Sequence, residues 1–472
     1  MGSTRKPSSL KAAQKPAAAL VAAAVAREPL LAHWTQTFMG NAAQFTAQFF
    51  PLFLLGALFG KLMDDSGSVE AIANFMTARL GTGRAVLAVV LAGALVTYGG
   101  VSVFVAFFVL GPMAQAIFRA ANIPRRLTPA AIGLGTLTFT MSALPGTPAI
   151  QNAIPMPFFD TTAFAAPGLG IIASAIMLGF GLWWLSRAEA AARRAGEGYG
   201  GDASIPTDAA VGDQVIRERA TTAREFDPAE IGHGQHGETA PPIFIALLPL
   251  CVVLCVNFVM SLIVLPRLDF SFLAEKRWGG TTLSAVAGVW SVAVALAAAV
   301  LTLVLANRHR LPALRQSMDS GANASVLPML TVASLVGFGA VVASLPGFAV
   351  VRDWVLSIEG GPLVSLAVAT NVLAALTGSA SGGMAIALDA LGSTYMRLAA
   401  EYGIDPALMH RVAVIGSGTL DSLPHNGGVV TLLAVCGTTH RESYFDIVMV
   451  AVVSAIIALV AVIALGSVFG SF

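Results

Sequence analysis

A polar, helix-breaking stretch lies inside an otherwise apolar region near the end of the chain. Residues 419–428 read Thr-Leu-Asp-Ser-Leu-Pro-His-Asn-Gly-Gly, between apolar runs at 412–415 and 429–435. Pro and Gly interrupt helices, and Asp, His and Asn are costly in hydrocarbon. Such backbone is tolerated at membrane depth only where it is buried in protein or lines a polar cavity. The stretch therefore predicts a broken transmembrane helix beside a binding site.

A second copy of this stretch occurs earlier in the chain. Residues 140–149 read Thr-Met-Ser-Ala-Leu-Pro-Gly-Thr-Pro-Ala, so both copies share the pattern Thr-x-x-x-Leu-Pro. Two short apolar segments joined by a Gly-containing tip precede each copy. They occupy 84–121, with the tip at 98–100, and 362–398, with the tip at 377–383. We interpret each pair as a re-entrant helical hairpin, two ordinary spans being the alternative. Broken helices in matching positions of two halves point to a transporter binding site.

The composition places this pattern in a lipid bilayer. Of the 472 residues, 56% are hydrophobic and only 11% are charged, whereas soluble domains carry about 25% charged residues. We predict an all-α polytopic membrane protein, with ordinary spans near 42–62, 163–185, 242–265, 281–306, 323–346 and 446–470 and broken helices at 128–153 and 408–438. A net charge of +1 argues against nucleic acid as a partner. Neither a cofactor nor a metal is expected.

The order of the elements predicts two inverted repeats. Four spans lie between the two broken helices if each hairpin enters and leaves on one side, so the second broken helix is the fifth crossing after the first and runs in the opposite direction. The predicted organisation is an atypical N-terminal tail at 1–30, a first membrane repeat at 31–185, a flexible loop at 186–240 and a second membrane repeat at 241–472. Residues 64–83 are expected to form an interfacial helix.

Basic residues near the span ends predict the orientation. Arg187, Arg193 and Arg194 follow one span, and Arg308, Arg310 and Arg315 follow another, which places the loop 186–240 in the cytoplasm. Lys276, Arg277 and Arg411 then fall outside, so the signal is not clean. The basic N-terminus also falls outside, and we expect a further membrane helix to precede it in the natural protein.

The breaks and hairpin tips carry the candidate binding groups. Helix N-termini suit an anion such as a carboxylate, and unwound carbonyls suit a cation. The candidate substrate-binding residues are Thr97, Gly99, Gly100, Ser102, Ser142, Gly146, Thr147, Gln151, Asn152, Thr377, Ser379, Ser381, Gly382, Gly383, Ser422, Asn426 and Gly427. They are neutral hydrogen-bonding groups, and glycines that let a backbone approach a ligand.

Three ionisable residues are candidates for proton coupling. Asp421 and His425 lie four residues apart, and burial favours the uncharged form of each group, so that the two could exchange a proton. The alternative is that Asp421 caps a half-helix and His425 has a structural role. Asp389 is a third candidate, because a carboxylate inside an apolar hairpin arm is costly without a partner.

Three runs in the chain resemble the gluconate permease family. They are SALPGTPAIQNAIP from Ser142, LTGSASGGMAIALDALG from Leu376 and GSGTLDSLPHNGGVVTLL from Gly416. The chain is most similar to the 3-hydroxybutyrate permease-like branch of this family, which belongs to the ion-transporter superfamily. The resemblance implies a carrier of the bacterial inner membrane, working as a homodimer by an elevator motion. It also implies proton-coupled uptake of sugar acids or hydroxy acids.

We therefore expect a secondary active transporter rather than an enzyme. The expected partners are a small hydroxy-monocarboxylate, H⁺ with Na⁺ as the alternative ion, and the bilayer. A cation/proton antiporter or a citrate-type carboxylate carrier is a second hypothesis, which the few acidic groups at depth weaken. An intramembrane enzyme using Ser422 and His425 is the third hypothesis. It is disfavoured, because Ser, His and Asp on one unwound turn do not suit the geometry of a catalytic triad.

Overall fold

The computed structural model describes residues 14–200 and 240–472, and within these ranges the chain forms helices and turns without a strand. Seven of the described helices are long and apolar enough to cross a membrane. They are Leu30–Asp65, Val103–Ala120, Pro167–Arg194, Ile243–Arg267, Leu283–Asn307, Leu314–Ser344 and His440–Phe469. The predicted all-α polytopic fold is confirmed.

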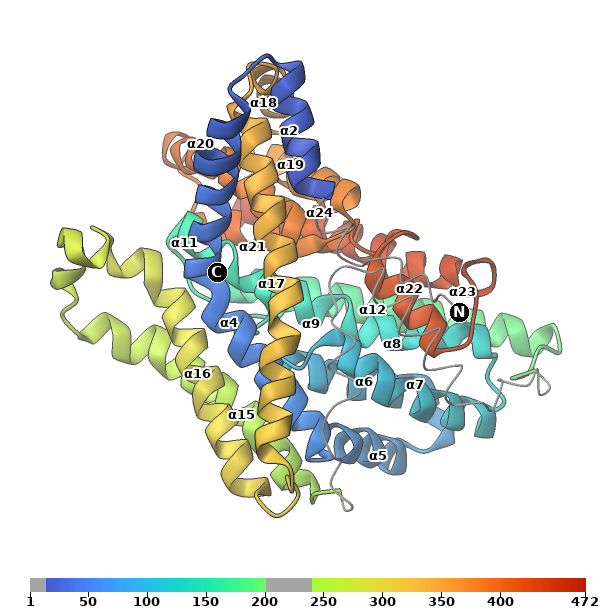
Figure 1. Cartoon of the computed structure of the whole chain (residues 1–472). Helices are drawn as coiled ribbons and strands as arrows, with labels where there is room; N and C mark the ends of the chain where they lie inside the picture. Colours follow the sequence, from blue (N-terminus) through green and yellow to red (C-terminus); the bar gives the residue numbers. More distant parts are fainter. Residues whose placement is uncertain (1–13, 201–239) are drawn as a thin grey trace, which may run out of the picture.

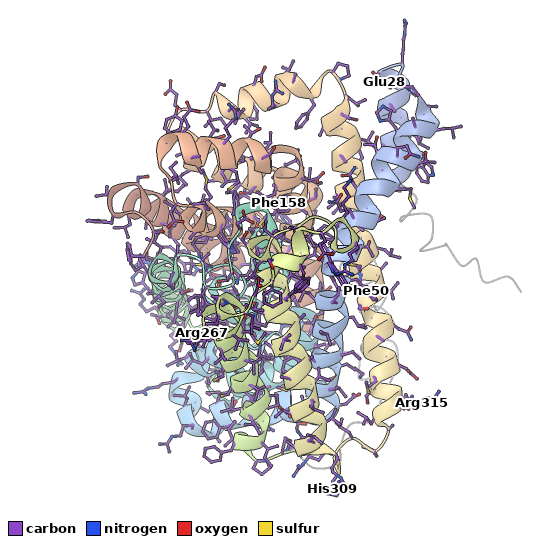
Figure 2. All side chains as sticks on the ribbon, turned by 90° about the vertical axis from the view of Figure 1, so that its left-hand side faces the viewer. Glu28, Phe50, Phe158, Arg267, His309 and Arg315 are labelled. Carbon is purple, nitrogen blue, oxygen red and sulfur yellow. The ribbon has the colours of Figure 1, made fainter. Side chains whose placement is uncertain are left out.

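Two long helices form a wall through the middle of the molecule. Helix α4 (Met39–Asp65) packs along α17 (Leu314–Ser344), and Figure 1 shows them side by side. The antiparallel pair α15 (Ile243–Val259) and α16 (Leu283–Asn307) adjoins them, on the side that faces the viewer in Figure 2. Each wall helix contains one proline, Pro51 in α4 and Pro328 in α17.

Both interrupted pairs form helical hairpins. The first consists of α6 (Ala85–Tyr98) and α7 (Val103–Ala120). The second consists of α19 (Gly361–Thr377) and α20 (Ala380–Tyr402).

The tip of the second hairpin is shorter than predicted. Only Gly378 and Ser379 lie between its helices, so the expected tip residues from Ser381 to Gly383 belong to α20. Gly383 is needed for packing, because a Cβ there would lie 2.3 Å from the backbone nitrogen of Ala374 in the other arm.

Both Leu-Pro stretches lie in breaks, as predicted. In the first half, α8 (Thr128–Thr136) and the short α9 (Phe139–Ser142) precede a non-helical stretch that ends where α10 (Ile150–Ala153) begins. In the second half, α21 (Pro406–Thr419) and α22 (Gly427–Val435) flank residues 420–426. Helical hydrogen bonding therefore stops where Pro, Gly and polar residues gather.

The remaining helices correct several predicted boundaries. Part of the expected tail forms α2 (Gln14–Val25), which packs on α17, and α12 (Pro167–Arg194) continues beyond the expected start of the loop at 186. The rest of that loop, 201–239, lies outside the described residues. The other elements are α5 (Ser68–Leu80), α11 (Met156–Phe159), α18 (Phe348–Leu356), α23 (His440–Ile447) and α24 (Ser454–Phe469).

Candidate functional site

A cavity of about 200 Å³ lies where the first hairpin tip and the first break face the wall. We call it the central cavity. Its predicted binding residues are Thr97, Gly100, Ser102, Gln151 and Ser381, so one residue of the second half joins four of the first. The wall contributes Leu52, Phe53, Gly56 and Ala57 from α4 and Ala324, Ser325, Pro328 and Val332 from α17. None of the described residues that line it carries a charge.

Hydrogen bonds fasten the first tip to the first break. The Thr97 hydroxyl donates to the Thr140 hydroxyl over 3.1 Å, and the Tyr98 hydroxyl donates to the Pro145 carbonyl over 2.8 Å. Gly100 permits this approach, since its φ is +98° and a Cβ would lie 2.7 Å from the Pro148 ring. The tip and the break therefore form one packed unit on the edge of the central cavity.

Several predicted residues hold the first break in shape instead of lining the cavity. Gly146, at φ +82°, donates from its backbone N–H to the Ala163 carbonyl over 2.8 Å. The buried Asn152 side chain donates to the carbonyls of Thr147 (3.0 Å) and Ala163 (3.1 Å). The Ser142 hydroxyl donates to Thr138 within its own helical turn. Unwound carbonyls in the interior thus receive the donors that they need.

Asn426 organises the second break. Its Oδ1 accepts from the backbone N–H groups of Gly428 (2.7 Å) and Val429 (3.2 Å), which makes it the N-cap of α22. Its Nδ2 donates to the Gly378 carbonyl at the second hairpin tip (2.8 Å) and to Asp421 Oδ1 (2.9 Å). One amide therefore joins the half-helix, the tip and the buried carboxylate.

The two proton-coupling candidates of the second break differ in exposure. Asp421 is buried, whereas His425 is exposed, with its Nε2 2.9 Å from the Ala375 carbonyl of the second hairpin. His425 contacts the second hairpin directly, whereas Asp421 is connected to its tip through the Asn426 side chain.

The other predicted residues of the tips and the second break do not line the central cavity. The Thr377 hydroxyl lies within hydrogen-bond distance of the carbonyls of Leu373, Ala374 and Ser379, and Ser379 caps α20. Gly99 packs against Leu250, and Gly382 packs against Leu335. Gly427 is the first residue of α22. Ser422 is buried, and its carbonyl accepts a hydrogen bond from the Tyr444 hydroxyl.

The two broken helices meet directly. A Cβ on Gly418 of α21 would lie 3.1 Å from the Ser142 Cβ, so glycine permits the contact. His410, on the same helix, is fully buried, with its Nε2 3.2 Å from Asn152 Oδ1 and its Nδ1 2.6 Å from the Thr161 hydroxyl. His410 thus connects the second half with the first break, a role that we did not predict.

Arg411 also departs from the sequence interpretation. It was expected at a span end outside, yet its side chain is fully buried. Its Nε and one Nη donate to the Ala165 carbonyl over 3.2 and 2.6 Å. The adjacent His and Arg at the start of an apolar helix were the available signal for both residues, because charged and titratable groups are rare in buried helices.

Asp389 lies away from the central cavity. It lines a second cavity of about 200 Å³ together with Asn41, Gln44 and Gln48 of α4. We call it the Asp389 cavity. The structure thus separates the three proton-coupling candidates into two locations.

Paired helical hairpins, paired broken helices and a cavity whose described lining residues carry no charge are the features of a membrane transporter. The comparisons give the family. Residues 31–177 match the GntP family permease model, and the chain is 40% identical over 444 residues to a Bacillus subtilis (strain 168) protein named uncharacterized transporter YxjC, covering 92% of this chain and 90% of that protein. The chain belongs to the GntP permease family.

A solved structure supports the fold. The crystal structure of the Alcanivorax borkumensis YdaH transporter, reported to have an unusual topology, aligns with a TM-score of 0.57 over 98% of both chains. At 17% identity this similarity concerns the fold alone. The chain is thus a multi-pass membrane transporter, and its relatives place it among permeases of bacterial inner membranes.

Proposed function

We propose that this chain takes up a small hydroxy-monocarboxylate of the gluconate or 3-hydroxybutyrate type together with a proton. The observation that carries the proposal is that two long helices, one from each half, begin at the central cavity. Ser102 and Val103 line it at the start of α7, and Ser381 lines it at the start of α20. Helix N-termini present free N–H groups and partial positive charge, which suit a carboxylate.

The remaining lining groups fit the same ligand. Thr97, Ser102, Ser381 and Gln151 offer neutral donors and acceptors for the carboxylate and hydroxyl groups, while Leu52 and Phe53 provide apolar contact. Because none of the described lining residues carries a fixed charge, a co-transported proton makes the loaded site formally neutral. A neutral load crosses hydrocarbon at lower cost than an anion.

We assign the proton to the Asp421–His425 pair, with tip closure as the coupled step. A protonated His425 makes a stronger, charge-assisted hydrogen bond to the Ala375 carbonyl than a neutral one. Proton binding therefore favours the second tip in contact with the second break. The central cavity lies between the wall and the hairpins, which suits an elevator-like movement of the hairpins and broken helices along α4 and α17.

Uptake into proteoliposomes tests the proposal. Labelled 3-hydroxybutyrate and gluconate are offered with and without an inward proton gradient. We expect His425→Ala and Asp421→Asn to abolish gradient-driven accumulation while substrate binding persists.

His309→Ala is the matched control, because His309 is exposed in the loop between α16 and α17 (Figure 2) and should leave uptake unchanged. Full gradient-driven uptake by both break variants would refute the assignment of the proton. Absence of saturable uptake of either acid by the unmodified chain would refute the substrate class.

A further inference from the structure

The Asp389 cavity follows the central cavity along the same three helices. On α4, residues 52–57 line the central cavity and residues 41–48 line the Asp389 cavity. On α20, Ser381 belongs to the first and Asp389 to the second, and on α17 the lining passes from Val332 to Val336. The Asp389 cavity is thus displaced toward the N-terminal end of α4.

That end of α4 is the outer one in the proposed orientation. At the opposite end, the turn after α4 touches the segment that follows the loop, since a Cβ on Gly67 would lie 3.4 Å from the Ala240 Cα. With the loop 186–240 in the cytoplasm, the C-terminal end of α4 is cytoplasmic. The Asp389 cavity then lies between the outer face and the central cavity.

The polar groups of the Asp389 cavity are unusual for a membrane span. Asn41, Gln44 and Gln48 recur at the spacing of one helical face, within a helix that is apolar enough to cross a bilayer. Asn41 donates its Nδ2 to the Thr37 carbonyl over 2.7 Å, which leaves its Oδ1 as the group available to a ligand. No Lys or Arg belongs to the described lining of this cavity, so the lining itself supplies no compensation for the Asp389 charge.

We propose that the Asp389 cavity is a binding site for Na⁺, with the Asp389 carboxylate and the amide oxygens of Asn41, Gln44 and Gln48 as its ligands. Hard cations take oxygen ligands from carboxylates and side-chain amides. One carboxylate balances one monovalent charge, whereas a divalent ion would leave an excess positive charge beside Phe45, Phe158 and Val336. A proton would need the carboxylate alone and would leave three amides without a role.

The position of the site gives it a function in the proposed uptake. A cation bound at Asp389 neutralises the carboxylate that would otherwise repel an organic anion on its way to the central cavity. The site therefore prepares the outer approach for an anionic substrate. Its existence does not depend on the proton assignment to Asp421 and His425, although this role rests on the proposed substrate class.

Binding of radioactive sodium to the purified full-length protein tests the inference directly. The measurement is made at fixed pH and without any organic acid, so that a wrong substrate class does not affect it. We expect saturable binding by the unmodified chain and at least a tenfold loss of affinity in Asp389→Asn. Glu401→Gln is the matched control, because Glu401 lies on the same helix α20 and is exposed, as Asp389 is, but does not line the cavity.

A second variant separates binding from folding. Gln44→Leu combined with Gln48→Leu retains the carboxylate but removes two amide oxygens, and it should weaken sodium binding several-fold while the protein stays monodisperse. Absence of saturable sodium binding by the unmodified chain would overturn the inference, and so would unchanged binding in Asp389→Asn. Unchanged sodium affinity after the loss of both glutamines would also overturn the proposed ligand set.

Discussion

Replacing Asn426 should separate the capping of α22 from the attachment of the second hairpin tip. Asn426→Ala removes both, whereas Asn426→Ser keeps a side-chain oxygen that caps helices about as well as asparagine does. Serine has no amide, so it cannot donate to the Gly378 carbonyl and to Asp421 as Asn426 does over 2.8 and 2.9 Å. The two variants therefore lose different parts of the same network.

The structure sets the size of each loss. The cap is worth about 1 kcal/mol, a side-chain hydrogen bond inside a membrane protein about 0.6 kcal/mol and a hydrogen bond to a charged group about 1.5 kcal/mol. Asn426→Ala should then lower the free energy of unfolding by about 3 kcal/mol and Asn426→Ser by about 2 kcal/mol.

Unfolding in mixed detergent micelles, followed by tryptophan fluorescence, measures both values. Asn371→Ala serves as the control, because the Asn371 amide donates to the Ala367 carbonyl within its own helix, and it should cost about 0.6 kcal/mol. A stability of Asn426→Ala equal to that of the control would refute the reasoning. Equal losses in the alanine and serine variants would show that the cap contributes nothing.

Three further outcomes are expected. Gly146→Ala should destabilise the protein by at least about 1 kcal/mol, because an L-residue at φ +82° is strained and its Cβ would meet the Phe164 ring at 2.6 Å. Gly179→Ala is the control and should not destabilise the protein, because a Cβ there meets nothing within 4 Å. Thermal melting compares the two variants. Asn152→Leu should cost about 2 kcal/mol or more by leaving buried polar partners unsatisfied, and unchanged melting would contradict this. A cysteine at Gly200 should react with an impermeant reagent only from the cytoplasmic side, and labelling of intact cells from outside would reverse the orientation.

Much of the architecture was predictable because its signals are local. Pro, Gly and polar residues within a few positions of Pro145 and Pro424 cannot continue an apolar helix, so both breaks were found. Helix ends were less accurate, since polar residues such as Asn41 and Arg315 continue helices beyond the apolar core. The span that was expected to begin at residue 42 is therefore part of a longer helix that begins at Leu30.

The candidate site was predictable only in part because its contacts are distant in sequence. The partners of Asn152 at Ala163 and His410, and the Asn257 amide that donates to the Gly146 carbonyl over 3.1 Å, leave no periodic signal. Glycines in the two hairpins also serve two different purposes, which the sequence does not distinguish. Gly100 lines the central cavity, whereas Gly383 makes room for the opposite hairpin arm.

The proline in α17 has a consequence for which acids the central cavity would prefer. Residue 328 has no N–H to donate, so the Ala324 carbonyl lacks its usual helical hydrogen bond, and both residues line the cavity. A backbone acceptor of this kind rewards a ligand hydroxyl and disfavours an analogue that lacks it. We expect Pro328→Ala, which restores the helical N–H, to narrow the ratio of 3-hydroxybutyrate to butyrate uptake, and an unchanged ratio would place the hydroxyl elsewhere. If the proposed substrate class holds, a missing helical hydrogen bond in the wall would let the carrier distinguish a hydroxy acid from a plain fatty acid.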